Sequence, residues 1–170
     1  ATLISRKAVT LQPQVAGQVV RIPVQPGDRI NDGETLLVID PARQAASVSS
    51  ASAAAASQQA EINQARQALK TIQAQRSALV SALQVSQAQY ERYKTLFEQK
   101  SASRQDLERY QDELQRAQAN LAANQTQAQA QQAAIQSSQR QYEQAKALAR
   151  EQAVTLGYHH IKAPFAGMVG

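Results

Sequence analysis

The chain has 170 residues, no cysteine and a formal net charge of +5. This length fits one ordinary domain, and the absence of cysteine excludes disulfides and thiolate ligands. No run of about 18 apolar residues occurs, so the sequence predicts no membrane-spanning helix.

Residues 8–40 alternate apolar and polar side chains in short runs, such as Val20-Arg21-Ile22-Pro23-Val24. Turn-forming residues separate these runs at Pro26-Gly27-Asp28 and Asn31-Asp32-Gly33. Short alternating runs between turns are typical of strands. We therefore expect a small β module before the first helix.

The next segment contains 115 residues between Pro41 and Gly157 without a glycine or a proline. Those two residues end helices, so their absence predicts helix almost throughout. A seven-residue apolar repeat with three- and four-residue steps runs through most of this stretch and breaks near residues 100 and 101. The fold class is therefore mainly α: a long antiparallel coiled-coil hairpin of residues 41–157, with its turn near residues 99–103.

The repeat defines two seams on each helix. In the first helix they are Ile62, Leu69, Arg76, Leu83, Tyr90, Phe97 and Ala65, Ile72, Leu79, Ser86, Tyr93. In the second they are Leu107, Leu114, Leu121, Ala128, Ile135, Tyr142, Ala149, Leu156 and Tyr110, Ala117, Asn124, Gln131, Ser138, Ala145, Gln152. Folding the chain at the turn so that large residues meet large ones pairs Leu83 with Leu121 and Leu69 with Ile135. The exception is Arg76, which lies opposite the small Ala128. We expect the seam tyrosines to serve core packing.

Helix ends carry recognisable signals. Asp40-Pro41 predicts an N-cap carboxylate followed by proline at the first helical position. Ser103-Arg104-Gln105-Asp106 resembles a capping box with aspartate in place of glutamate or glutamine. Gly157 follows the last seam residue, where a left-handed C-cap is expected.

The C-terminal segment echoes the N-terminal one. Phe165-Ala166-Gly167-Met168-Val169 aligns with Val15-Ala16-Gly17-Gln18-Val19. We interpret residues 1–40 and 158–170 as two halves of one β module, separated by the hairpin. The second half stops before a copy of the Pro-Gly-Asp turn, and Ala1 is not an initiator methionine, so we expect a fragment of a longer protein.

A split biotinyl/lipoyl-like module around a long glycine- and proline-free hairpin resembles the periplasmic adaptor proteins, also called membrane fusion proteins of the HlyD/AcrA type. The resemblance covers essentially the whole chain. It implies a periplasmic adaptor that links an inner-membrane transporter to a TolC-like outer-membrane channel, in several copies, six by family analogy. It also implies membrane attachment only through a missing N-terminal anchor.

A lipoyl or biotin carrier is a rival interpretation of the β module. Carriers present the modified lysine on the turn between the two halves, where this chain has the hairpin. Residues 28–42 contain no lysine, and Lys162 lies inside the second half. We therefore expect no cofactor, and Lys162 is interpreted as a surface strand residue.

Near the bend, the spacing of Arg92, Leu96 and Ser103 matches the tip motif by which members of the adaptor family engage TolC-like ducts. Arg92 and Leu96 are four residues apart, so they share a helix face, and neither lies on a seam. An apolar side chain beside a cation predicts a small docking patch. Three alternatives remain: Leu96 widens the core, Arg92 pairs with a carboxylate, and Ser103 is purely an N-cap.

Other chemistry is sparse in this sequence. The adjacent pair His159-His160 points to opposite faces of a strand and lacks a third histidine or cysteine, so we expect a structural or solvent-exposed role. No nucleophile motif, phosphate loop or metal signature occurs, which argues against an enzyme. The hairpin has 13 basic and 9 acidic residues. We interpret that excess as spread out and interrupted by Glu108, Asp112 and Glu113, a solvated surface without a nucleic-acid stripe.

The function that fits these features is a periplasmic adaptor for export of small molecules or proteins. The alternative is a coiled-coil scaffold or tether without a conduit.

Overall fold

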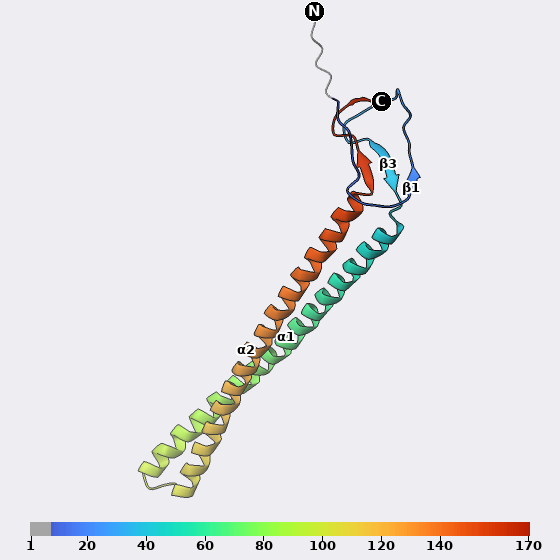
Figure 1. The fold of residues 1–170 in the computed structure, drawn as a ribbon. Coiled ribbons are helices and arrows are strands. Elements are labelled where there is room, and N and C mark those ends of the chain that lie inside the picture. The colour runs from blue at the N-terminus through green and yellow to red at the C-terminus, as the bar shows by residue number, and fades with distance from the viewer. Residues whose placement is uncertain (1–7) are drawn as a thin grey trace, which may run out of the picture. The chain divides into compact units, whose positions relative to one another are not determined.

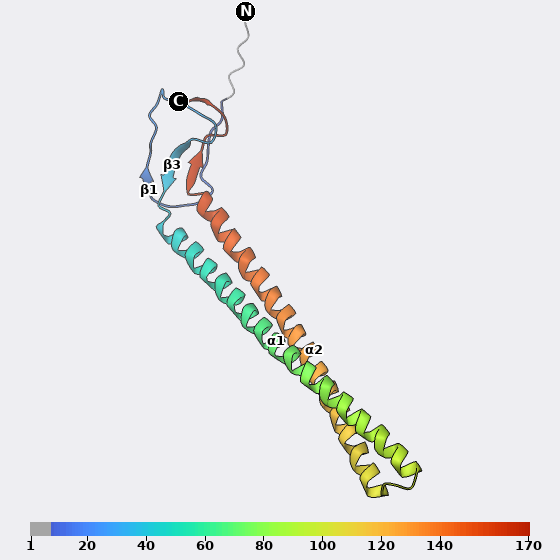
Figure 2. The same cartoon turned by 180° about the vertical axis from the view of Figure 1, so that it is seen from behind.

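A computed structural model describes residues 8–170; residues 1–7 of the expected first half-module lie outside the described part. The elements in chain order are β1 (Val19–Arg21), β2 (Arg29–Ile30), β3 (Thr35–Ile39), α1 (Ala42–Glu98), α2 (Arg104–Gly157), β4 (His160–Lys162) and β5 (Gly167–Met168). The described residues divide into two compact units, one containing residues 8–57 and 143–170 and the other residues 58–142. In each unit, segments of α1 and α2 lie side by side (Figures 1 and 2).

Strands from both ends of the chain pair with each other in the first unit. A three-stranded antiparallel sheet has the order β1-β3-β4, and β2 pairs with β5 in a second, two-stranded sheet. Backbone hydrogen bonds continue this pairing beyond the strands: Gly33 donates to Ala163 at 2.9 Å and Gly27 donates to Val169 at 2.8 Å. The segments on either side of the hairpin therefore form one β structure.

Tight turns in the first half-module depend on glycine. Gly27 and Gly33 have φ angles of 94° and 78°, a conformation that a side chain disfavours. Gly17 has another reason to be glycine, since a Cβ there would lie 2.6 Å from Cγ2 of Ile39. Ile39 is 3% exposed, so Gly17 lets the backbone pack directly on this buried side chain.

The first helix starts at the expected aspartate and the second ends differently from the prediction. Asp40 Oδ1 accepts a hydrogen bond from the Ala42 amide at 3.0 Å. The expected left-handed cap at Gly157 is wrong, because Gly157 is the last helical residue and its φ is not positive. The final carbonyls are instead satisfied by the Tyr158 and His159 amides and by the His159 ring, whose Nδ1 lies 3.0 Å from the Thr155 oxygen.

Burial confirms the predicted seams. Every predicted seam residue of α2 is buried or half-buried, and so is every predicted seam residue of α1 except Arg76, which is exposed. The most buried seam side chains include Ile62 at 2% exposure, with Ile72, Ala117 and Ile135 at 8%. The mainly helical hairpin with a small β part is thus the observed fold class.

Two hydrogen bonds fix how the helices of the second unit align along their axes. Asn124 Nδ2 donates to the Ile72 carbonyl at 3.0 Å, and Gln131 Nε2 donates to the Ala65 carbonyl at 3.1 Å. The predicted alignment puts Asn124 level with residue 80, about 9 Å along the axis from the Ile72 carbonyl oxygen, beyond the reach of an asparagine. The predicted alignment is therefore wrong by about one helical turn, and Asn124 instead lies level with Arg76.

This shift changes which side chains face each other. It places Ile72 opposite Ala128, Ile62 opposite Ser138, and Ala117 opposite Leu83. In these three layers a large residue meets a small one, whereas Leu79 lies opposite Leu121. The size of the facing residues alone therefore does not determine the alignment.

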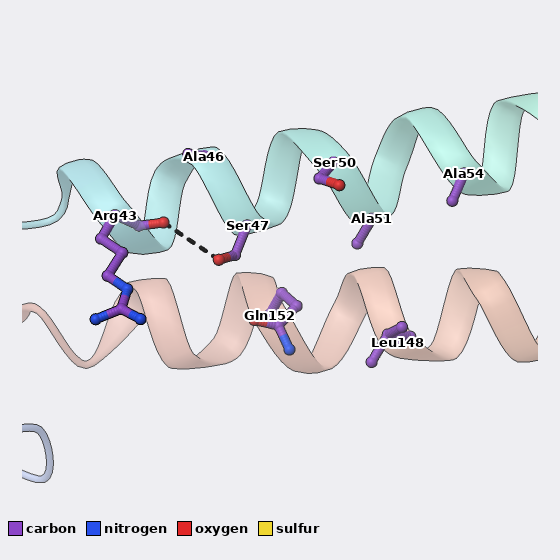
Figure 3. A pocket seen from close by; sticks show the side chains of 8 residues that line it. All are labelled: Arg43, Ala46, Ser47, Ser50, Ala51, Ala54, Leu148 and Gln152. Carbon is purple, nitrogen blue, oxygen red and sulfur yellow. Dashed lines mark hydrogen bonds between the residues drawn. The ribbon is translucent and has the colours of Figure 1, made fainter.

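The part of the hairpin that belongs to the first unit contains an open groove of about 590 Å³ (Figure 3). Gln44 Nε2 donates to the carbonyl and the side-chain oxygen of Gln152, both at 2.9 Å, and so links the helices there. Small side chains of α1 line the groove with Leu148 of α2. Arg43 is its one charged lining residue, so the groove offers no acid–base pair.

Candidate functional site at the hairpin tip

The loop that joins the helices is held by backbone hydrogen bonds at the end of α1. The Ser101 amide donates to the Leu96 carbonyl at 2.7 Å, and the Lys100 amide donates to the Phe97 carbonyl at 2.9 Å. These two bonds form a Schellman motif, with Lys100 at the left-handed position, φ 58°. Glycine is the usual residue there, so this lysine is held in a disfavoured conformation.

The start of α2 is a capping box with aspartate. Ser103 Oγ accepts a hydrogen bond from the Asp106 amide at 3.1 Å, and the Ser103 amide donates to Asp106 Oδ2 at 3.4 Å. The Ser103 hydroxyl also donates to Asp106 Oδ2 at 2.5 Å. The Ser103 hydroxyl therefore both accepts a hydrogen bond from the helix and donates one to Asp106, while the residue stays exposed.

Arg92 and Leu96 lie on successive turns of α1, and Ser103 is the last residue of the five-residue loop between the helices. Arg92 is exposed, and within residues 8–170 it makes no ion pair or side-chain hydrogen bond. Leu96 is half-buried, so part of its apolar surface remains open. The structure joins the three side chains by no direct bond; it places a free cation and an accessible apolar group close to the loop.

An aromatic pair packs across the hairpin near the tip. The rings of Tyr93 and Tyr110 stack with their centroids 4.0 Å apart, and the Arg109 guanidinium lies 5.6 Å from the Tyr110 centroid. A side-chain hydrogen bond with Tyr93 raises the pKa of Tyr110 above its ordinary value of 10.0, and desolvation by burial is the next largest cause. Both tyrosines keep their predicted seam positions and act as packing residues.

Elsewhere, the described residues show little other chemistry. His159 is buried and caps α2, whereas His160 is exposed on β4. Residues 8–170 contain no group of three or more histidine, cysteine or acidic side chains placed to hold a metal ion. Lys162 is an exposed residue of β4. No helix in this part of the chain is apolar enough over a sufficient length to cross a membrane.

Two tip residues were not identified from sequence as site residues. Asp106 was expected only as a cap, yet it engages the Ser103 hydroxyl directly. Lys100 carries no sequence signal for a left-handed conformation, because lysine normally avoids it. The absence of glycine from the loop was the available hint that some other residue must make the turn.

Residues 7–170 match the family described as "RND MFP, barrel-sandwich hybrid domain". No curated protein matches the sequence.

Three solved structures illustrate the similarity to known folds. The periplasmic adaptor protein EmrA is 14% identical, with a TM-score of 0.49, and the comparison covers 92% of this chain and 63% of that one. MacA from Actinobacillus actinomycetemcomitans is 26% identical, with a TM-score of 0.44, covering 91% and 39%. The soluble domain of LipC, a membrane fusion protein of a type I secretion system, is 17% identical, with a TM-score of 0.33, covering 94% and 90%.

The chain thus spans less than two thirds of the length of EmrA and of MacA. The family match covers nearly every residue, including both β segments and the hairpin between them. This chain belongs to the RND membrane fusion protein family through its barrel-sandwich hybrid domain.

Proposed function

We propose that this chain is the hairpin-bearing part of a periplasmic adaptor that links an inner-membrane transporter to a TolC-like outer-membrane channel. The family match over residues 7–170 supports this proposal, since members of the family are adaptor proteins of efflux and secretion systems. The adaptor works in the periplasm in several copies, six by family analogy. Its role is to join two membrane proteins, with no catalytic step of its own.

The hairpin tip is the proposed docking site for the channel. Arg92 provides a cation without an internal partner, and Leu96 provides open apolar surface one turn away. An unpaired guanidinium forms strong, charge-assisted hydrogen bonds to carbonyl or carboxylate oxygens. The Ser103 hydroxyl is occupied by Asp106, so Ser103 contributes mainly by fixing the start of α2.

A matched pair of variants tests this site. Leu96→Ser in the complete adaptor should weaken binding to a purified TolC-like channel by about tenfold or more and stop export. Its melting temperature should change little, because Leu96 is off the seam. Val85→Ser is the control, since Val85 is an apolar residue of α1 with 57% of its surface exposed, away from the loop.

Equal effects of Leu96→Ser and Val85→Ser on channel binding would contradict docking at the tip. An adaptor that ignores every such channel and stays monomeric at rising concentration would favour the alternative, a tether without a conduit. Surface plasmon resonance and sedimentation measure these two outcomes independently.

A further inference from the structure

The basic residues near the bend differ in whether a carboxylate lies one turn away on the same helix. Between residues 91 and 113 they are Arg92, Lys94, Lys100, Arg104 and Arg109. Three have acidic residues three or four positions away, the spacing at which opposite charges interact along a helix: Lys94 has Glu91 and Glu98, Arg104 has Glu108, and Arg109 pairs with Glu113 at 3.3 Å. Arg92 and Lys100 have no acidic residue at these spacings, and within residues 8–170 neither makes an ion pair or a side-chain hydrogen bond.

Lys100 is the more unusual of these two cations, because its backbone is left-handed. Its φ angle is 58°, at a position where glycine is the usual residue. The turn is made by backbone groups, since the two hydrogen bonds of the Schellman motif come from the Lys100 and Ser101 amides. The Lys100 side chain is exposed and adds no bond to that turn. A disfavoured conformation that the side chain does not help to hold is a reason to look for a function of that side chain.

The same motif places Lys100 close to Leu96. The Ser101 amide donates to the Leu96 carbonyl at 2.7 Å, so the loop folds back onto the last turn of α1. In Schellman motifs the two residues that share this bond commonly make an apolar contact as well. Serine has no apolar side chain to provide that contact, and Leu96 stays half-buried. An open apolar group therefore has one cation, Arg92, a turn before it and a second, Lys100, just beyond the end of its helix.

The charges around these three residues favour a protein surface as the partner over a phosphate-rich one. Between residues 91 and 113, six acidic residues stand beside the five basic ones. Closely spaced phosphates, as in a nucleic acid or an anionic membrane, would be repelled by these carboxylates as well as attracted by the two cations. Separate carboxylates beside an apolar socket avoid most of that repulsion. An ammonium group suits such a partner, because it is a compact charge whose donors rotate to meet the acceptor.

Building on the channel docking proposed above, we propose that Lys100 is a second cationic docking residue, which binds a carboxylate of the outer-membrane channel beside the socket that receives Leu96. The rival role is local, since a cation just beyond the C-terminus of α1 interacts favourably with the helix dipole. A local role predicts that loss of the charge lowers stability and leaves channel binding unchanged. Docking predicts the opposite: weaker binding with stability retained.

Surface plasmon resonance of the complete adaptor on a purified TolC-like channel separates these roles. Lys100→Gly removes the cation and relieves the backbone, so binding should weaken about fivefold or more at low ionic strength while the melting temperature does not fall. The loss should shrink at high salt, because screening weakens the contact. Lys100→Asn should lose the same affinity, since asparagine also tolerates the left-handed conformation. Lys100→Arg keeps the charge and should stay within about threefold of the unmodified adaptor.

Lys94→Gln is the matched control, because it removes the same charge from a residue with Glu91 and Glu98 one turn away, and it should change affinity about twofold or less. Equal losses in Lys94→Gln and Lys100→Gly would overturn the proposal, because binding would then follow net charge alone. Unchanged affinity in Lys100→Gly and Lys100→Asn, with binding lost in Leu96→Ser, would overturn the role of Lys100 and leave the proposed function standing.

Two further outcomes would also count against the proposal. An adaptor that does not bind the channel at all would overturn both the role of Lys100 and the proposed function. Binding to phosphatidylglycerol vesicles that depends on Lys100 and exceeds binding to the channel would identify a membrane, and not the channel, as the partner of this residue.

Discussion

The tip and the middle of the hairpin are stabilised in different ways. At the tip, hydrogen bonds between residues close together in the chain stabilise the helix ends: a Schellman motif ends α1, and Ser103 with Asp106 caps the start of α2. In the middle, apolar side chains are buried between the helices, and Asn124, level with Arg76, donates a hydrogen bond from α2 to the Ile72 carbonyl of α1. One end of a coiled coil is thus specified locally, whereas its centre depends on how two distant segments align.

The largest expected effect tests the alignment of the middle. Ala128→Leu should destabilise the hairpin by about 1–3 kcal/mol, because the larger side chain overpacks against Ile72. Urea unfolding followed by circular dichroism measures the change. Ala133→Leu, at an exposed position of α2, is the control and should be nearly neutral. If Ala128→Leu is neutral or stabilising, Ala128 faces Arg76 and the large-to-large alignment is correct after all.

A smaller effect is expected at the start of α2. Ser103→Ala should cost about 1 kcal/mol, because the Asp106 amide loses its hydrogen-bond acceptor, whereas Ser103→Asp should preserve most of the stability. Hydrogen exchange of the first-turn amides reports the loss locally. Ser101→Ala is the control, since the Ser101 hydroxyl makes only a long hydrogen bond of 3.4 Å to the Gln99 carbonyl. Similar exchange in all three variants would mean that the capping box is unimportant.

Asn124 allows a stabilising change in the middle. Asn124 is 6% exposed, and its Oδ1 has no partner among the described residues. Asn124→Leu should therefore raise stability by about 1 kcal/mol, while removing the hydrogen bond that marks the alignment with Ile72. Thermal melting measures the gain, and the exposed Gln125→Leu serves as the reference. A lower melting temperature for Asn124→Leu would show that its hydrogen bond outweighs the unsatisfied oxygen.

The smallest effect is expected in the loop. Lys100→Gly should stabilise the chain by less than about 1 kcal/mol, because glycine adopts φ 58° without a steric penalty. Lys94→Gly, in the regular part of α1, should instead cost about 1 kcal/mol. Chemical unfolding of both variants compares them, and destabilisation by Lys100→Gly would argue that the lysine side chain has a stabilising contact in the loop.

The helices, their seams and two of the caps could be predicted from the sequence, because these features depend on residues close together in the chain. Period-seven spacing determines which face of each helix is apolar, and burial confirmed that face at every predicted position but Arg76. The same spacing leaves the axial alignment open, because a shift of one turn again brings seam residues together. Only the long-range bonds of Asn124 and Gln131 resolve it.

The ends of elements and the geometry of the proposed docking site were less predictable. Gly157 looked like a left-handed cap, but the buried ring of His159 supplies the hydrogen bond that such a cap would provide. Asp106 binds the Ser103 hydroxyl through its carboxylate, and Lys100 adopts a left-handed backbone conformation; residue type alone revealed neither. For Arg92 and Leu96, the spacing predicted a shared helix face. The structure adds that the Arg92 side chain is exposed and that Leu96 is half-buried.

The pairing of β3 with β4 and of β2 with β5 has a consequence for the order of folding. During synthesis, residues 8–40 leave the ribosome long before their partners at residues 160–169 exist. Closing a flexible chain of that length is entropically unfavourable and slow. A hairpin that forms first, starting from the local contacts of its tip, would bring the two β segments together as its helices zip toward them. On this view the coiled coil is also an internal folding template for the β structure that holds its two ends.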